Sequence, residues 1–284
     1  MDAAFFDRTA RGRLIVTGHD RRDLLHRLCT NDIASLTAGH SRSTCFLNRK
    51  GQMIDWTVVL DRDDDLLVLT ANPQRISGHI QGYTIAEDVT VRNYMALEII
   101  VCGPDAARVL GVQLDPWSHT SIQLGEVEVL VARIEALWGD AYAILAPDAV
   151  ALRRRLSEDA RPIEPDEVDF LRIKSGIPAY PNEINEQHNP WEARLDSTIS
   201  LEKGCYVGQE VVARLRTYDK VQRKLVGLQF DGAREAGDAL SQGQNEVGAI
   251  TTVAGELALG YVARGFWEPG TTLDGATVVE LPMT

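Results

Sequence analysis

Three stretches of the chain share one order of apolar and polar positions. Each starts with an apolar run of strand length, passes through a small-residue turn with an aspartate, and continues with apolar residues at helical spacing. In the first, Asp20 can cap a helix with a leucine face. The repeat predicts strand–helix units in an α+β core with antiparallel sheet, although coincidence of common turn chemistry gives the same pattern. The stretches are residues 14–28, 98–110 and 142–156.

Other segments also have clear periodicity. Residues 46–60 and 64–72 have the composition of strands and are bounded by turn residues. Residues 167–176 predict a helix that ends at Gly176, because its first turn is acidic and glycine suits a helix end. From about Val221 onward the helical spacing disappears. Short β-branched segments there predict a small all-β module, a barrel.

The composition is that of a globular protein with more than one domain. The chain has 284 residues, of which 44% are apolar and 25% charged. Its net charge of −12 argues against broad attraction to nucleic acid or anionic membrane. No apolar run has the length of a membrane span, and the N-terminal sequence lacks the features of a secretory signal. We therefore expect a soluble, cytoplasmic protein.

The cysteines are widely spaced, and no C-x-x-C pair occurs. We therefore expect no metal site made by this chain alone, and no disulfide in a cytosolic setting. Three of the four lie among apolar neighbours, which predicts small core residues. Cys205 has a different setting. The cysteines are Cys29, Cys45, Cys102 and Cys205.

Cys205 lies in the segment KGCYVGQE, where two glycines allow an irregular backbone that approaches a ligand closely. A neighbouring lysine favours the thiolate, whereas two flanking glutamates oppose it. A tyrosine can stack on a ring, and a glutamine can both donate and accept hydrogen bonds. The alternative is a buried cysteine in a turn before a solvated edge strand. The candidate residues are Lys203, Gly204, Cys205, Tyr206, Gly208, Gln209 and Glu210.

A dense group of basic residues follows this segment. Arg214 and Arg216 alternate along a stretch predicted to be extended, which would put both on one face. Together with Lys220, Arg223 and Lys224 they form a basic patch in an acidic chain. Such a patch suits an anionic ligand or partner.

KGCYVGQE resembles the signature of the YgfZ family, folate-binding proteins related to the aminomethyltransferase (T-protein) of the glycine cleavage system. Residues 17–33, 46–56, 169–178 and 189–210 are similar to further motifs of that family, in the same order. The resemblance implies an aminomethyltransferase-like folate-binding fold in a ring-like arrangement. Two intertwined α/β subdomains would occupy residues 1–218, and a C-terminal β-barrel module residues 219–284.

The resemblance also implies a ligand and partners. Tetrahydrofolate, or a one-carbon derivative, would occupy the central opening, and the protein would assist iron–sulfur enzymes, including those that modify tRNA. The family's motif places the reactive thiol on Cys205. We expect the pterin near Asp55, Asn72 and Glu192. The anionic tail would meet Lys203, Arg214 or Arg223.

Two positions depart from the related transferases. Their hairpin carries two adjacent aspartates, one of them catalytic, where this chain has Asp55 and Trp56. Their pterin-holding glutamate is replaced by Lys174, and a lysine cannot accept hydrogen bonds from the donor edge of a pterin. Either Glu192 or Asp55 compensates, or the ring is held differently. Because the transferases also lack a cysteine like Cys205, we expect folate binding without aminomethyl transfer.

Four polar residues have competing structural interpretations. Asn31 and Asp32 follow a predicted helix, so capping explains them as well as a pocket-lining role does. Asn72 follows a predicted strand and suits either the pocket or a turn. Glu192 lies in an irregular stretch, where a solvated carboxylate is common.

Three hypotheses of function follow. The first is a folate-dependent accessory factor for iron–sulfur client or assembly proteins, with Cys205 as nucleophile, transient cluster contact or redox handle. The second is a tetrahydrofolate-dependent one-carbon transferase with Asp55 as general base. The third is a non-catalytic adaptor that binds tRNA or a protein through residues 214–224. The net charge makes tRNA the less favoured partner.

Overall fold

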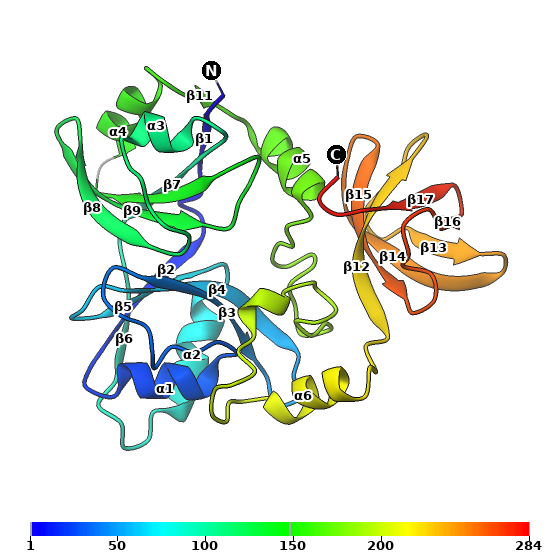
Figure 1. Ribbon diagram of the computed structural model, residues 1–284, viewed down its shortest axis with the longest axis horizontal. Coiled ribbons are helices and arrows are strands. Elements are labelled where there is room, and N and C mark those ends of the chain that lie inside the picture. The colour runs from blue at the N-terminus through cyan, green and yellow to red at the C-terminus, as the bar shows by residue number, and fades with distance from the viewer. Residues whose placement is uncertain (1, 148, 284) are drawn as a thin grey trace. The chain divides into compact units, whose positions relative to one another are not determined.

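The computed structural model describes residues 2–147 and 149–283 (Figure 1). Contacts between Cα atoms divide the chain into two compact units. The short segment Asn48–Met53 belongs to unit 2, although the residues before and after it belong to unit 1. Both units are thus built from separate stretches of sequence. Unit 1 is Met1–Leu47, Ile54–Glu164 and Ser197–Val207, and unit 2 is Asn48–Met53, Pro165–Asp196 and Gly208–Thr284.

Unit 1 contains a five-stranded sheet in the order β3-β4-β5-β2-β6, with two helices on one face (Figure 1). Leu24, Leu25 and Leu28 of the first helix are buried in one cluster with Leu14 and Val16 of β2. Full burial of a leucine stabilises the fold by about 1.5–3 kcal/mol. The elements are β2 (Gly12–Thr17), α1 (Arg21–Leu28), β3 (Ser41–Leu47), β4 (Met53–Asp61), β5 (Leu66–Thr70), α2 (Pro73–Tyr83) and β6 (Thr90–Asn93).

Unit 1 also contains a six-stranded sheet in the order β11-β1-β7-β10-β9-β8. Its core joins Val101 and Ile144 of the sheet with Val109 and Leu152 of two helices. The segment that follows residue 160 contributes the edge strand β11, which pairs in parallel with β1. The elements are β1 (Ala4–Asp7), β7 (Leu97–Cys102), α3 (Ala106–Leu110), β8 (His119–Leu124), β9 (Val127–Ile134), β10 (Ala141–Ala146), α4 (Ala149–Leu156) and β11 (Arg161–Pro162).

The repeated strand–helix pattern is confirmed as the pairs β2–α1, β7–α3 and β10–α4. The side-chain cap expected from Asp20 is wrong. Asp20 occupies the N-cap position of α1, but its side chain makes no hydrogen bond to the helix. Its Oδ2 instead accepts the backbone N–H of Asp88 at 2.8 Å, which ties the start of α1 to the loop before β6.

Unit 2 contains the predicted C-terminal all-β module. Its six strands lie in the order β13-β14-β15-β12-β17-β16. The two edge strands, β13 and β16, contact each other, so the sheet is nearly closed into a barrel. Val226, Leu228 and Ile250 belong to its buried core. The strands are β12 (Arg223–Phe230), β13 (Ala239–Gln242), β14 (Asn245–Ala254), β15 (Leu257–Ala263), β16 (Thr272–Leu273) and β17 (Ala276–Val279).

The helix predicted near residue 170 is confirmed as α5 (Pro165–Ser175), which packs on β14 and β15. It ends as expected, because Gly176 adopts a left-handed backbone conformation with φ of 72°. A short 3-10 helix, η1, covers Asp196–Thr198. No helix in the described part of the chain is long and apolar enough to cross a membrane.

The stretch predicted to be extended after KGCYVGQE is a helix, α6 (Gln209–Thr217). Arg214 and Arg216 lie two positions apart, which is about 200° around a helix, so they do not share one face. The Arg216 guanidinium lies over the Trp191 ring, 5.4 Å from its centroid. Val212 is buried as part of a helical face. The strand-like basic face expected here is therefore absent.

Candidate functional site

Lys203 anchors the thiol-bearing loop to the end of α1. Its Nζ donates hydrogen bonds to the backbone carbonyls of His26, of Cys29 at 2.7 Å and of Asn31 at 2.8 Å. An ammonium group has three donors, so each one has a carbonyl partner. Burial lowers the pKa of Lys203, while the charge of Asp32 acts in the opposite direction. The cation therefore closes the C-terminal end of α1, where the helix dipole favours positive charge.

The loop presents Cys205 to solvent between two anchored neighbours. Cys205 is exposed, whereas Cys29, Cys45 and Cys102 are buried, as the sequence predicted for those three. Tyr206 is 8% exposed, and burial raises its pKa to about 12. The Lys203 ammonium lies 5.1 Å from the centre of the Tyr206 ring. The thiol thus projects from a backbone that is fixed on both sides.

The two glycines of this loop have different roles. Gly208 has a φ of 83°, and a Cβ there would lie 2.7 Å from the carbonyl oxygen of Asn48. Gly51 meets Val211 of α6 in a similar way, with 3.0 Å between a Cβ built on it and the valine Cβ. Gly208 therefore allows the Asn48–Met53 turn to pack against α6 within unit 2. A Cβ at Gly204 would meet nothing within 4 Å.

Asp55 is buried and holds the start of α2. One carboxylate oxygen accepts hydrogen bonds from the hydroxyl of Thr70 and from the backbone N–H groups of Ala71 at 2.8 Å and Asn72 at 3.2 Å. The other accepts the N–H of Trp56 at 2.9 Å. Burial raises the pKa of Asp55, against the effect of these hydrogen bonds. This carboxylate thus joins the end of β5 to α2.

Asn72 occupies the N-cap position of α2, but its side chain does not cap the helix. Trp56, the next residue of this hairpin, donates from Nε1 to the hydroxyl of Ser43 at 2.6 Å. In this hairpin, the carboxylate of Asp55 therefore accepts hydrogen bonds and the indole of Trp56 donates one.

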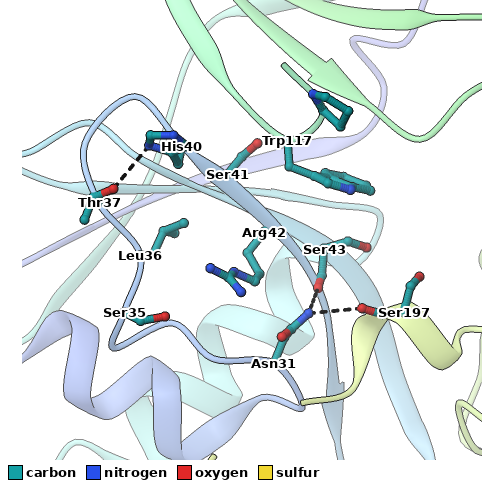
Figure 2. A pocket seen from close by; sticks show the side chains of 11 residues that line it. Asn31, Ser35, Leu36, Thr37, His40, Ser41, Arg42, Ser43, Trp117 and Ser197 are labelled. Carbon is teal, nitrogen blue, oxygen red and sulfur yellow. Dashed lines mark hydrogen bonds between the residues drawn. The ribbon is translucent and has the colours of Figure 1, made fainter. Parts of the chain in front are cut away.

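Unit 1 contains a polar pocket with a volume of about 420 Å³ (Figure 2). Asn31, one of the predicted residues, lies in its wall and donates to the carbonyls of Ser43 at 2.8 Å and Ser197 at 3.3 Å. Asp32 does not line it; its Oδ1 accepts the backbone N–H of Ser35 at 3.2 Å. The lining residues are Asn31, Ser35, Leu36, Thr37, His40, Ser41, Arg42, Ser43, Pro116, Trp117 and Ser197.

Sequence reasoning missed Arg42 and Trp117. Figure 2 shows the side chain of Arg42 pointing into the pocket, towards the loop of Ser35 and Leu36. No motif marked either residue, and 75 positions separate them in the sequence. They are brought together because the backbone N–H of Ser41 donates to the carbonyl of Trp117 at 2.6 Å, which links the two sheets.

Several of the predicted residues belong to unit 2. The Glu192 carboxylate is largely buried, and its Oε2 accepts the backbone N–H of Asn189 at 3.0 Å and lies 3.7 Å from His188 Nδ1. The solvated carboxylate considered for Glu192 is therefore wrong. The backbone carbonyl of Lys174 accepts from Met283 at 2.7 Å. The exposed predicted residues of this unit are Glu210, Arg214 and Arg223, and Gln209 is half-buried.

Across residues 2–147 and 149–283, no group of three or more histidine, cysteine, aspartate or glutamate residues is placed to hold a metal ion.

The fold is that of an aminomethyltransferase. The crystal structure of the glycine cleavage system aminomethyltransferase T from Bartonella henselae is similar over the whole chain, with a TM-score of 0.88. The similarity covers 100% of this chain and 86% of that one at 22% sequence identity, so it concerns the fold alone. The model of the GCVT N-terminal domain matches residues 1–203, and the chain belongs to this family.

Curated relatives carry transferase names. A chloroplastic protein of Arabidopsis thaliana, named as a candidate transferase, is 28% identical across 92% of this chain and 66% of its own length. Aminomethyltransferases of Caldanaerobacter subterraneus and Thermotoga neapolitana are 26% and 27% identical across 94% and 91% of this chain. The match spans 74% and 78% of those two proteins. The predicted aminomethyltransferase-like fold is thereby confirmed.

Proposed function

We propose that this protein binds a tetrahydrofolate and acts as a YgfZ-like accessory factor for iron–sulfur enzymes, including tRNA-modifying ones, with Cys205 as its reactive group. One observation carries the proposal: an exposed thiol stands on an anchored loop, while both oxygens of the hairpin carboxylate accept hydrogen bonds from neighbouring groups. Membership of the GCVT family supports a folate ligand.

The loop around Cys205 is suited to present a thiol. Lys203 and Tyr206 are held by unit 1, and the next residue, Val207, donates its backbone N–H to the carbonyl of Arg27 at 3.1 Å. A reactive group gains from such support because less freedom is lost when it meets its partner. An exposed thiol can also meet a large partner, such as an iron–sulfur protein, whereas the buried cysteines cannot.

The state of Asp55 weighs against a transferase that uses it as a base. One Asp55 oxygen accepts three hydrogen bonds and the other accepts the backbone N–H of Trp56, so only the second oxygen keeps a lone pair. A general base needs a free lone pair within hydrogen-bond reach of the proton that it removes. Trp56, the neighbouring residue, has no acceptor nitrogen, because its indole N–H only donates.

Calorimetric titration of the purified protein with tetrahydrofolate tests the ligand. We expect saturable binding, and no heat up to millimolar ligand would refute it. The role of the thiol is tested in cells that lack the protein, by measuring the activity of an iron–sulfur enzyme. We expect the Cys205→Ser variant to fail in restoring that activity. Gly204→Ala is the matched control, because it changes the same loop without crowding a neighbour; full rescue by Cys205→Ser would remove the thiol from the mechanism.

A folate-dependent one-carbon transferase is the second candidate, favoured by the names of the relatives. Formation of methylenetetrahydrofolate from an aminomethyl donor by the purified protein would establish it. If an Asp55→Asn variant still binds folate but loses that activity, Asp55 is the general base.

A further inference from the structure

The Arg11 side chain is a cation close to Asp55 in unit 1. It is half-buried, and its guanidinium makes no hydrogen bond or ion pair with any of the described residues. Burial, together with the Arg8 charge, lowers the pKa of Arg11 to about 10, while the charges of Glu98 and Asp55 act in the opposite direction. This guanidinium therefore has five N–H donors and, in the described part of the chain, no acceptor for them.

The five-stranded sheet brings Arg11 close to Asp55. Arg11 directly precedes β2, and the first residue of that strand, Gly12, pairs with Thr70 at the end of β5. Asp55, on β4, accepts hydrogen bonds from the hydroxyl of Thr70 and from the backbone N–H of Ala71, the residue after it. Because β4 and β2 lie on either side of β5, Arg11 and Asp55 are at the same end of the sheet.

The Arg11 side chain is directed away from the helices of this sheet. A Cβ on Gly12 would lie 2.3 Å from the Pro73 side chain at the start of α2, so that position of the strand faces the helix. Neighbouring residues of a strand point to opposite faces, and Arg13 accordingly donates to Glu98 of β7 at 3.3 Å. Arg11, two positions before Arg13, shares the face opposite α1 and α2 (Figure 1).

The charged groups around Arg11 leave one positive charge uncompensated. The two oxygens of Glu98 pair with Arg8 and Arg13, and Asp55 accepts hydrogen bonds from uncharged groups. Arg8, Arg11 and Arg13 thus bring three positive charges against two negative ones, and Arg11 forms an ion pair with neither carboxylate. An oxyanion would complete this arrangement, because charge-assisted bonds from arginine to carboxylate or phosphate are among the strongest hydrogen bonds in proteins.

We propose that Arg11 is an anion-binding residue, which holds a carboxylate or phosphate group of a ligand at the Asp55 end of this sheet. A neutral pterin ring would leave the charge of Arg11 uncompensated, so the ring is not the group that Arg11 holds. Two sources share the chemistry of an oxyanion. One is a carboxylate of the folate, in which case the subsite rests on the proposed function; the other is a separate small anion.

The test measures the affinity of the full-length protein for tetrahydrofolate, for inorganic phosphate and for 6-methyltetrahydropterin, which has no carboxylate. Titrations run in chloride at constant ionic strength. Arg11→Met removes the charge and keeps most of the side-chain volume. Arg92→Met is the matched control, because Arg92 is exposed on β6 of the same sheet and pairs with Ile15, four positions from Arg11. We expect Arg11→Met to weaken binding of tetrahydrofolate or phosphate at least tenfold and Arg92→Met to leave both unchanged.

The pattern of losses identifies the source of the anion. If Arg11→Met weakens tetrahydrofolate but not 6-methyltetrahydropterin, Arg11 holds a folate carboxylate. If it weakens phosphate and leaves tetrahydrofolate unchanged, the anion is a separate ligand. Phosphate binding that depends on Arg11 in a protein that binds no folate would keep the subsite and refute the proposed function. A weaker affinity of Arg11→Met for 6-methyltetrahydropterin would assign Arg11 to the ring and overturn the anion subsite.

Thermal unfolding separates ligand binding from a structural role. Because Arg11 has no partner among the described residues, Arg11→Met should leave the melting temperature unchanged or higher. Arg8→Met removes a partner of the buried Glu98 carboxylate and should lower it. An equal loss in both variants would show that Arg11 is a structural residue. Equal affinities of wild type and Arg11→Met for all three probes, or no saturable binding of any of them, would overturn the subsite.

Discussion

The ammonium of Lys203 donates to the backbone carbonyl of Asn31 at 2.8 Å, across 172 positions of sequence. The carbonyl belongs to the residue whose side chain lines the polar pocket, and the lysine lies two positions before the exposed thiol. One hydrogen bond in unit 1 thus joins the loop that carries Cys205 to the wall of the polar pocket. This link makes the position of each depend on the other.

Replacing Lys203 by methionine should destabilise unit 1. The change removes three hydrogen bonds to carbonyls at the end of α1, and we expect a loss of about 2–4 kcal/mol in the free energy of unfolding. Urea denaturation followed by circular dichroism measures it. Lys50→Met, at an exposed position, is the control and should change stability by no more than about 0.5 kcal/mol. Equal stability of the two variants would contradict the anchoring role.

His26 should make the protein less stable in mild acid. Burial, together with the Lys203 charge, lowers the pKa of His26, against the opposite effect of Asp32, whose Oδ1 lies 3.1 Å from His26 Nδ1. Below pH 6.5, the ordinary pKa, the unfolded chain therefore binds a proton that the folded chain does not. By linkage, stability falls as the pH drops from about 7 towards the lowered pKa.

Urea denaturation at pH 7.5 and 5.5 tests this dependence. His26→Gln should reduce the loss of stability between the two values, because the amide does not titrate. In Lys203→Met, the His26 pKa measured by NMR should rise, since a neighbouring positive charge has been removed. An unchanged His26 pKa in that variant would show that the Lys203 charge does not act on His26.

Cys205 should be the first cysteine to react with a small alkylating agent. It is exposed, while the other three thiols are fully buried in the fold. Burial raises the pKa of Cys29, and that of Cys45 to about 12, which further suppresses their thiolates. Mass spectrometry after brief treatment with iodoacetamide should show one modification in the native protein and four after unfolding. Early labelling of a second cysteine would show local opening of unit 1.

The two glycines beside Cys205 should differ sharply in tolerance. Gly208→Ala forces a Cβ to within 2.7 Å of a backbone oxygen at a positive φ, and we expect a loss of about 1–3 kcal/mol. Gly204→Ala meets open space and should be nearly neutral. Thermal unfolding of both variants provides the comparison. Equal melting temperatures would show that the turn at Asn48 can move away.

Local patterns predicted much of the fold. The strand–helix units, the end of α5 at Gly176 and the all-β module follow from hydrophobic periodicity and turn residues, which act over a few positions. The prediction of an extended stretch failed in the α6 region, because β-branched residues such as Val211 and Val212 favour strands locally, whereas the fold buries Val212 on a helical face. The left-handed Gly208 and the buried Val212 decide in favour of the helix.

The sequence by itself determined which thiol is different: Cys205 stands in a polar, glycine-flanked segment, and its three counterparts stand among apolar residues. The tertiary structure decided what surrounds it. Lys203 was expected to act on the thiol or a ligand, yet its donors meet carbonyls more than 170 positions away. The Arg42–Trp117 pocket depends likewise on two sheets meeting. Periodicity describes neighbours along the chain, whereas hydrogen-bond partners and cavities depend on segments that only the fold brings together.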